Sequence, residues 1–96
     1  MSRVYYTKVA EEDLHNIAEY TIAQWGKEQW VKYMDLIEQT CETIIPQNMR
    51  HGRPVPQRPL LQRWRCERHV VYFRRVRGGT EMVRILHARM LPLNHL

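Results

Sequence analysis

Arginine and histidine side chains in the C-terminal part of the sequence have the types that cleavage of RNA by its own 2′-hydroxyl group requires. That reaction needs a base to remove the hydroxyl proton, cations to hold the phosphate, and an acid to protonate the leaving oxygen. In the alternative interpretation, His87 only caps local backbone at a strand end, and His95 is mobile because it lies next to the terminus. The candidate ribonuclease set consists of His87, Arg89 and His95, with Arg65 or Arg63 from a neighbouring strand.

The sequence lacks the motifs of the common catalytic classes. It contains no G-x-x-x-x-G-K-[ST], no G-x-G-x-x-G, no H-E-x-x-H and no G-x-S-x-G. Ser2 is the only serine, which excludes a serine hydrolase. Cys41 and Cys66 form no C-x-x-C pair, and we expect both to be free thiols. The histidines have no metal-ligand spacing, so we expect no metal and no cofactor; they are His15, His51, His69, His87 and His95.

Charge divides the chain into an acidic half and a basic half. Residues 1–48 carry four basic and eight acidic side chains, whereas residues 49–96 carry eleven basic and two acidic ones, and all eleven are arginine. The planar fork of arginine binds phosphates and carboxylates through paired hydrogen bonds and also stacks on flat rings. We therefore expect the C-terminal half to bind an anionic partner, either nucleic acid or an acidic protein segment. The alternative is a solvated basic face without a partner.

Length and composition indicate one globular domain over residues 1–96. The chain is 44% hydrophobic and 26% charged, which is typical of globular proteins. No apolar run approaches the roughly 18 residues that a membrane span requires, and the first residues lack the layout of a signal peptide. The expected location is the cytoplasm, with no membrane partner.

A strand and a helical hairpin are predicted in the N-terminal half. The strand covers residues 3–7, and Thr7 is a typical N-cap for a helix over residues 10–25. Gly26 ends this helix, and a second helix over residues 27–45 stops at Pro46. The apolar stripes expected to face the core are Ala10, Leu14, Ile17, Thr21 and Trp25 in the first helix and Trp30, Met34, Ile37, Cys41 and Ile44 in the second.

Three antiparallel strands are predicted after a long proline-containing surface loop over residues 47–59. They cover residues 60–66, 69–76 and 80–87, and Gly78 and Gly79 suit the tight turn before the last strand. The order β-α-α-β-β-β predicts an α+β fold of two layers, with the helical hairpin packed on one face of an antiparallel sheet.

Alternation along these strands is expected to place arginines in a row on the open face of the sheet, beside Trp64 and Tyr72. Such a row is a platform for anions or bases. The alternative is that the two rings are half-buried sheet aromatics. Alternation places Val71 and Phe73 opposite Val70, Tyr72, Arg74 and Val76, and it places Val83, Ile85 and His87 opposite Met82, Arg84 and Leu86.

Several motifs follow one another along nearly the whole chain. They are Thr7-x-x-Ala10-x-x-Asp13-Leu14-x-x-Ile17-x-x-Tyr20, Trp25-Gly26, Gly52-Arg53, Val83-Arg84-Ile85-Leu86-His87-x-Arg89-Met90 and His95-Leu96. In this order they resemble the ParE branch of the RelE/ParE toxin superfamily.

The resemblance implies the toxin of a type II toxin–antitoxin module with the same β-α-α-β-β-β fold. It implies inhibition of DNA gyrase by binding rather than by catalysis, and neutralisation by a cognate antitoxin with an acidic, partly disordered C-terminal region. The toxin–antitoxin complex would repress its own operon by binding operator DNA. The residues expected to bind the target or the antitoxin are Arg65, Arg74, Arg84, Arg89, His95, Trp64 and Tyr72.

The resemblance also leaves a second activity open, because RelE-like members cleave messenger RNA on the ribosome. Arg89 matches a basic position of those enzymes, and His95 lies near their C-terminal acid or base. The lysines expected of that branch are absent, since no lysine follows Lys32. Leu91 stands where ParE sequences commonly have aspartate. The absence of those lysines favours the gyrase branch over the ribonuclease branch.

Overall fold

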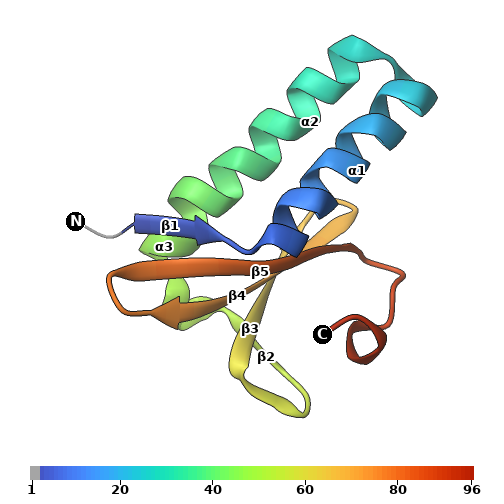
Figure 1. Cartoon of the computed structure of the whole chain (residues 1–96). Coiled ribbons are helices and arrows are strands. Elements are labelled where there is room, and N and C mark those ends of the chain that lie inside the picture. Colours follow the sequence, from blue (N-terminus) through green and yellow to red (C-terminus); the bar gives the residue numbers. More distant parts are fainter. Residues whose placement is uncertain (1–2) are drawn as a thin grey trace.

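A computed structural model describes residues 3–96 as two helices packed on one face of a five-stranded sheet (Figure 1). The strand order is β1-β5-β4-β3-β2. The predicted α+β fold of two layers is confirmed. The elements are β1 (Arg3–Tyr6), α1 (Lys8–Trp25), α2 (Lys27–Gln39), α3 (Ile45–Gln47), β2 (Arg53–Val55), β3 (Arg58–Cys66), β4 (His69–Val76) and β5 (Gly79–His87).

Local signals set the bounds of the helical hairpin. The Thr7 side chain accepts a hydrogen bond from the Ala10 main-chain N–H (3.0 Å), which caps α1 as predicted. Gly26, with φ 90°, separates α1 from α2 and donates its N–H to the Ile22 carbonyl. The hairpin extends beyond the sheet, so Trp25 at its tip is 61% exposed rather than part of the core (Figure 1).

A π-helical turn over Thr40–Ile44 joins α2 to α3 and corrects the predicted second helix. The helical path does not stop at Pro46, because Pro46 lies in the first turn of α3, where its missing N–H costs little. The wider turn also shifts the buried stripe by one residue at its end. Tyr33, Ile37, Cys41 and Ile45 are buried, whereas the predicted Trp30, Met34 and Ile44 are half-buried.

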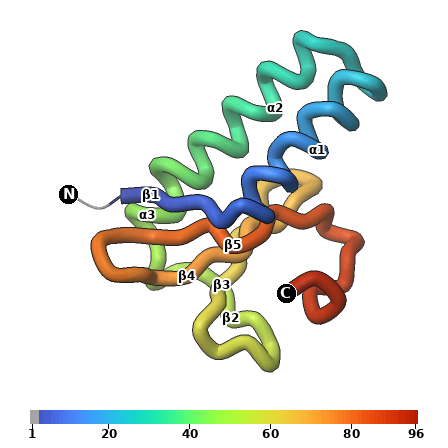
Figure 2. The backbone as a smooth tube through the Cα atoms, in the orientation of Figure 1, coloured from blue at the N-terminus to red at the C-terminus, as the bar shows by residue number. Residues whose placement is uncertain are grey.

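The sheet is mixed rather than antiparallel. β1 pairs in parallel with β5, with Val4 opposite Thr80, while the other neighbours are antiparallel. The segment over residues 47–59 was expected to be a surface loop, but it contains a strand that was not predicted, β2, which pairs with β3. Figure 2 shows that the chain then returns from β5 and curls beside the sheet at its C-terminal end.

A bulge in β5 breaks the predicted alternation. Tyr72 of β4 lies opposite Arg84, and the next residue, Phe73, lies opposite Met82, so Val83 has no partner on β4. Met82 therefore packs on the helix side with Ile85, and not on the other face with Arg84 and Leu86 as predicted.

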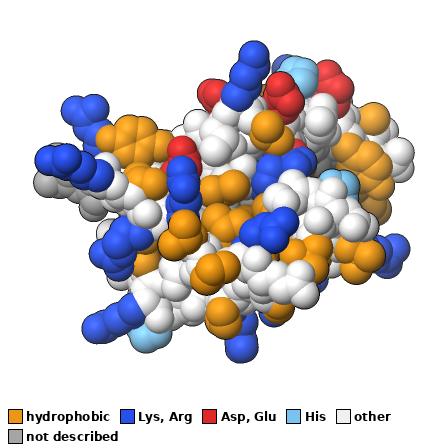
Figure 3. Space-filling view, turned by 60° about the horizontal axis from the view of Figure 1, so that its bottom comes forward, with side chains coloured by type: hydrophobic (Ala, Val, Ile, Leu, Met, Phe, Trp, Pro, Cys, Tyr) orange, Lys and Arg blue, Asp and Glu red, His pale blue; other side chains and the backbone are white. Residues whose placement is uncertain are grey.

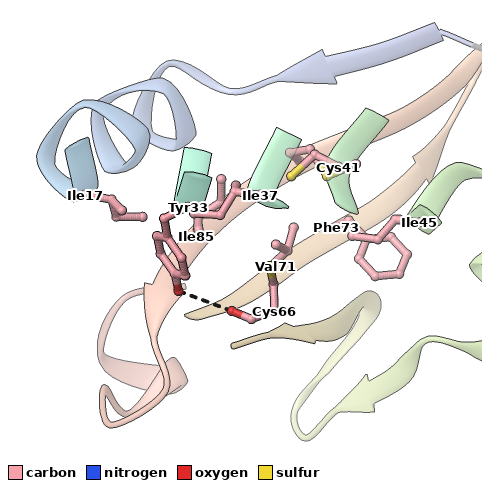
Figure 4. Packing of buried hydrophobic residues seen from close by; sticks show 10 residues of the cluster. Ile17, Tyr33, Ile37, Cys41, Ile45, Cys66, Val71, Phe73 and Ile85 are labelled. Atoms are coloured by element: carbon pink, nitrogen blue, oxygen red, sulfur yellow. Dashed lines mark hydrogen bonds between the residues drawn. The ribbon is translucent and has the colours of Figure 1, made fainter. Parts of the chain in front are cut away.

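Two apolar clusters occupy the two faces of the sheet. The larger one lies between the sheet and the helices and includes Ile17, Ile37 and Phe73 (Figure 4). The smaller one consists of Val55, Tyr72 and Leu86, with Leu61, Val70 and Leu96 packed against it. The face that carries the smaller cluster is called the outer face below.

Candidate functional site

Arginine side chains from three strands, β2, β3 and β5, project from the outer face of the sheet. Arg53 of β2 is the Cα partner of Arg63 of β3, which lies opposite Tyr72, and Tyr72 lies opposite Arg84. Directly opposed residues of antiparallel strands point to the same face. Figure 3 shows Lys and Arg side chains around a hydrophobic area on the side of the molecule that it presents. The expected gathering of arginines on one face is therefore present for these strands.

Arg84 is held by α1 rather than free for a partner. Its Nε and Nη2 atoms donate to the two oxygens of Asp13, each at 2.9 Å, and Asp13 also accepts the main-chain N–H of Ile85 (2.9 Å). The hydrogen bonds with Asp13 raise the pKa of Arg84 above its usual value. β1 pairs only with the first residues of β5 and leaves the main-chain N–H of Ile85 without a strand partner. Asp13 provides the hydrogen-bond acceptor for this N–H group.

The remaining predicted arginines differ in how they are engaged. Arg74 forms an ion pair with Glu81 on the neighbouring strand (2.7 Å). Arg65 donates to the main-chain oxygen of Glu67 and is otherwise exposed. Arg89 lies in the exposed turn after β5, where its main-chain N–H donates to Nδ1 of His87 (3.1 Å).

The C-terminal residues cover part of the outer face. Arg84 donates to the main-chain oxygen of His95 (2.8 Å), and Arg58 donates to that of Leu96 (2.9 Å). Leu96 packs against the smaller apolar cluster, in which Tyr72 is only 3% exposed. Burial raises the pKa of Tyr72, and the nearby charge of Arg63 opposes this shift.

The predicted platform of two exposed aromatic rings is therefore wrong. Tyr72 does lie on the outer face, but the C-terminal residues and the neighbouring strands bury it. Trp64 lies opposite Val71 and packs against the larger cluster on the helix side. The register of β3 thus puts the two rings on opposite faces of the sheet.

A groove next to the end of β2 brings together three of the arginines. It has a volume of about 440 Å³. None of the residues that line it, all within the described part of the chain, is acidic. This arginine groove is lined by His51, Arg53, Arg63, Trp64, Arg65 and Val70.

The four residues of the candidate ribonuclease set do not come together. Arg65 is the Cα partner of Val70 and shares the outer face with the smaller cluster. His87 is the partner of His69 on the helix side, with their rings 5.4 Å apart. The sheet therefore separates Arg65 from His87. His95 contributes its main-chain oxygen to Arg84 rather than a contact to His87.

A buried contact between Tyr33 of α2 and His69 of β4 lies on the helix side of the sheet, and the sequence did not predict it. The Tyr33 hydroxyl lies 2.6 Å from Nδ1 of His69 and accepts the main-chain N–H of Arg68 (3.2 Å). Burial, with the nearby charges of His87 and Arg68, lowers the pKa of His69 to about 4, so the ring that contacts the Tyr33 hydroxyl is neutral. No sequence spacing links residues that far apart, and only the fold joins them.

Exposed apolar side chains gather on the part of the hairpin that extends beyond the sheet. Tyr20 and Trp25 are 63% and 61% exposed, and Ile22 and Val31 are also exposed. The guanidinium of Arg68 lies 5.9 Å from the Trp25 ring centre, within range of a cation–π contact. This hairpin tip is a second candidate surface for a protein partner.

The described residues show no group of three or more metal-ligating side chains close enough to hold an ion. None of the helices they form is long and apolar enough to cross a membrane.

Comparison with known proteins identifies the family. The sequence model described as "ParE toxin of type II toxin-antitoxin system, parDE" matches residues 4–92. A search of curated proteins gives no match. A solved structure titled "Chromosomal ParDE TA system from P. aeruginosa" is similar, with a TM-score of 0.74 and 23% sequence identity over 91% of this chain and 96% of that chain. This structural similarity shows the fold, and the match to the family model covers nearly the whole sequence. The chain therefore belongs to the ParE toxin family of type II toxin–antitoxin systems.

Proposed function

We propose that this toxin, acting as one domain over residues 1–96 in the cytoplasm, inhibits DNA gyrase and blocks replication until a cognate antitoxin neutralises it. Membership of the family supports a toxin with an antitoxin partner. The target and the mode of neutralisation are inferred from the family together with the surfaces of the molecule.

The observation that carries the proposal is the outer face, which combines arginines with an apolar cluster. Arg63 and Arg65 lie next to the cluster of Val55, Tyr72 and Leu86. An acidic antitoxin segment that folds on binding would pair its carboxylates with such arginines and bury its own apolar side chains beside them. The complex would then bind operator DNA through the antitoxin.

Gyrase would be engaged by one of two surfaces. The arginines of the outer face and the turn with Arg89 suit a gyrase–DNA complex, in which phosphates are abundant. The hairpin tip with Tyr20 and Trp25 suits an apolar pocket of a protein, because exposed aromatic side chains often dominate binding energy. Both surfaces act by binding, so the proposal needs no catalytic residue, metal or cofactor.

The ribosome-dependent ribonuclease is the alternative function, and the geometry gives it less support. Its residues Arg65 and His87 lie on opposite faces of the sheet. A ribonuclease would require its base and its phosphate-binding cation around one phosphate.

Controlled expression in bacteria separates the two functions. We expect growth arrest with induction of a DNA-damage reporter, while messenger RNAs remain intact by primer extension. Cleavage within codons, lost in His95→Ala or Arg89→Ala, would replace the proposal by the ribonuclease function. Growth without arrest would show that the chain is not an active toxin.

A further inference from the structure

The arginine groove has features of an anion site that are not needed for the fold. We propose that it binds backbone phosphates of single-stranded nucleic acid, as a site of its own that needs neither gyrase nor the antitoxin.

The first argument is the direct opposition of Arg53 and Arg63 across β2 and β3. Like charges at opposed positions of an antiparallel pair destabilise the sheet. Among the described residues neither side chain has a carboxylate within ion-pair distance, whereas Arg74 and Arg84 both do. A bound anion would relieve this repulsion.

The second argument is the spacing of the arginine side chains along β3. Arg65 lies two residues beyond Arg63 on the same face, about 6.6 Å further along the strand. The pairing of β2 with β3 ends at Arg63, so β2 does not cover the edge of β3 over residues 64–66. An extended strand of phosphates laid along this edge would meet Arg53 and Arg63 together and then Arg65, and His51 also lines the groove.

The lining favours nucleic acid over an acidic peptide. Three guanidinium forks match phosphate oxygens. Trp64 packs on the helix side but is only half-buried, and it also lines the groove at the uncovered edge of β3, where a base can stack on it. A peptide would need apolar contacts inside the groove as well, but Val70 is the one aliphatic side chain that lines it.

Fluorescence polarisation of a labelled oligothymidylate of about twelve nucleotides tests this site without gyrase. Each phosphate contact on a single strand contributes about −0.7 to the slope of log K against log salt, so three arginines predict a slope of about −2. Arg53→Gln and Arg63→Gln should each weaken binding about fivefold at about 0.1 M salt and reduce the slope by about 0.7. Arg75→Gln is the matched control, because Arg75 lies opposite Thr80 on the helix side and its loss changes net charge equally.

Thermal stability is a second measurement, and it distinguishes specific binding at the arginine groove from nonspecific attraction by the protein's net positive charge. Arg63→Gln should raise the melting temperature of the free protein at low salt, because it removes the opposed charge, and oligothymidylate should stabilise wild type but not this variant. The proposal is overturned if Arg75→Gln weakens binding as much as Arg63→Gln, or if the oligonucleotide does not bind. It is also overturned if polyglutamate of equal length competes as strongly as unlabelled oligothymidylate. Loss of this site would leave the gyrase proposal standing, since no gyrase is present in the assay.

Discussion

Asp13→Ala should destabilise the fold by about 3 kcal/mol. Asp13 accepts three hydrogen bonds of 2.9 Å, two from the Arg84 guanidinium and one from the Ile85 main-chain N–H. The side chains of Asp13 and Arg84 are only 11% and 21% exposed. Removing one partner of a buried ion pair costs about 3–5 kcal/mol, and the partial exposure of Arg84 places this case at the lower end.

The assay is urea unfolding followed by far-UV circular dichroism, which gives the free energy of unfolding for each variant. Glu38→Ala, an exposed acidic position on α2, is the control and should change this free energy by less than about 0.5 kcal/mol. The double variant Asp13→Leu/Arg84→Met should recover part of the loss, because a well-packed apolar pair replaces the ion pair. If Asp13→Ala is as stable as Glu38→Ala, the ion pair between Asp13 and Arg84 does not stabilise the contact of α1 with β5.

Three further predictions concern buried groups and a close backbone approach. The pKa of His69 is lowered to about 4 in the folded protein, so the folded state binds fewer protons than the unfolded state between about pH 4 and the ordinary pKa of about 6.5. The free energy of unfolding is therefore highest above about pH 6.5 and decreases as the pH falls from there towards 4. Compared with His69→Gln in urea unfolding, wild type should therefore lose up to about 3 kcal/mol more over this range. Burial raises the pKa of Cys41 to about 12, so a disulfide reagent should label it only after unfolding, as absorbance of the released thiolate shows. Gly79→Ala should cost about 2 kcal/mol or more in thermal unfolding, because a Cβ would lie 1.9 Å from the Arg3 main-chain oxygen and separate β1 from β5.

Two of these predictions have a matched control variant, and each has a result that would contradict it. His15 is exposed on α1, so His15→Gln should keep the pH profile of wild type; a profile unchanged by His69→Gln would contradict the buried neutral histidine. Rapid labelling of the native protein would contradict the burial of both cysteines. Arg77→Ala lies in the same turn as Gly79 and should be nearly neutral, and equal stability of Gly79→Ala would contradict the close packing of β1 on β5.

The elements of the fold were predictable where their signals are local. Thr7 caps α1, Gly26 separates the helices, and Gly78, with φ 86°, lies in the turn that the sequence predicts before the last strand. The parallel pairing of β1 with β5 was not predictable, because its partners lie more than 70 residues apart and have no shared local motif. The bulge at Val83 and the π-helical turn each insert one residue into a periodic pattern, and strict alternation or helical spacing cannot locate such an insertion.

The sequence predicted the positive charge of the candidate site but not the contacts that its individual residues make. Alternation predicted Arg84 on the same face as Tyr72, and the register places the two residues directly opposite each other. Composition could not show that Arg84 would be bound by Asp13, because the two residues meet only when α1 packs against β5. It also could not show that Leu96 would pack over the cluster containing Tyr72.

A supercoiling assay with purified gyrase tests the proposed function most directly. The wild-type toxin should inhibit supercoiling in proportion to its concentration, and the cognate antitoxin, added in equal amount, should restore it. Arg63→Gln/Arg65→Gln should need at least several times more antitoxin for the same recovery than Arg50→Gln/Arg75→Gln, which removes the same charge away from the outer face. Normal supercoiling at a large excess of wild-type toxin would contradict gyrase as the target. Equal antitoxin requirements of the two variants would contradict the outer face as the antitoxin site.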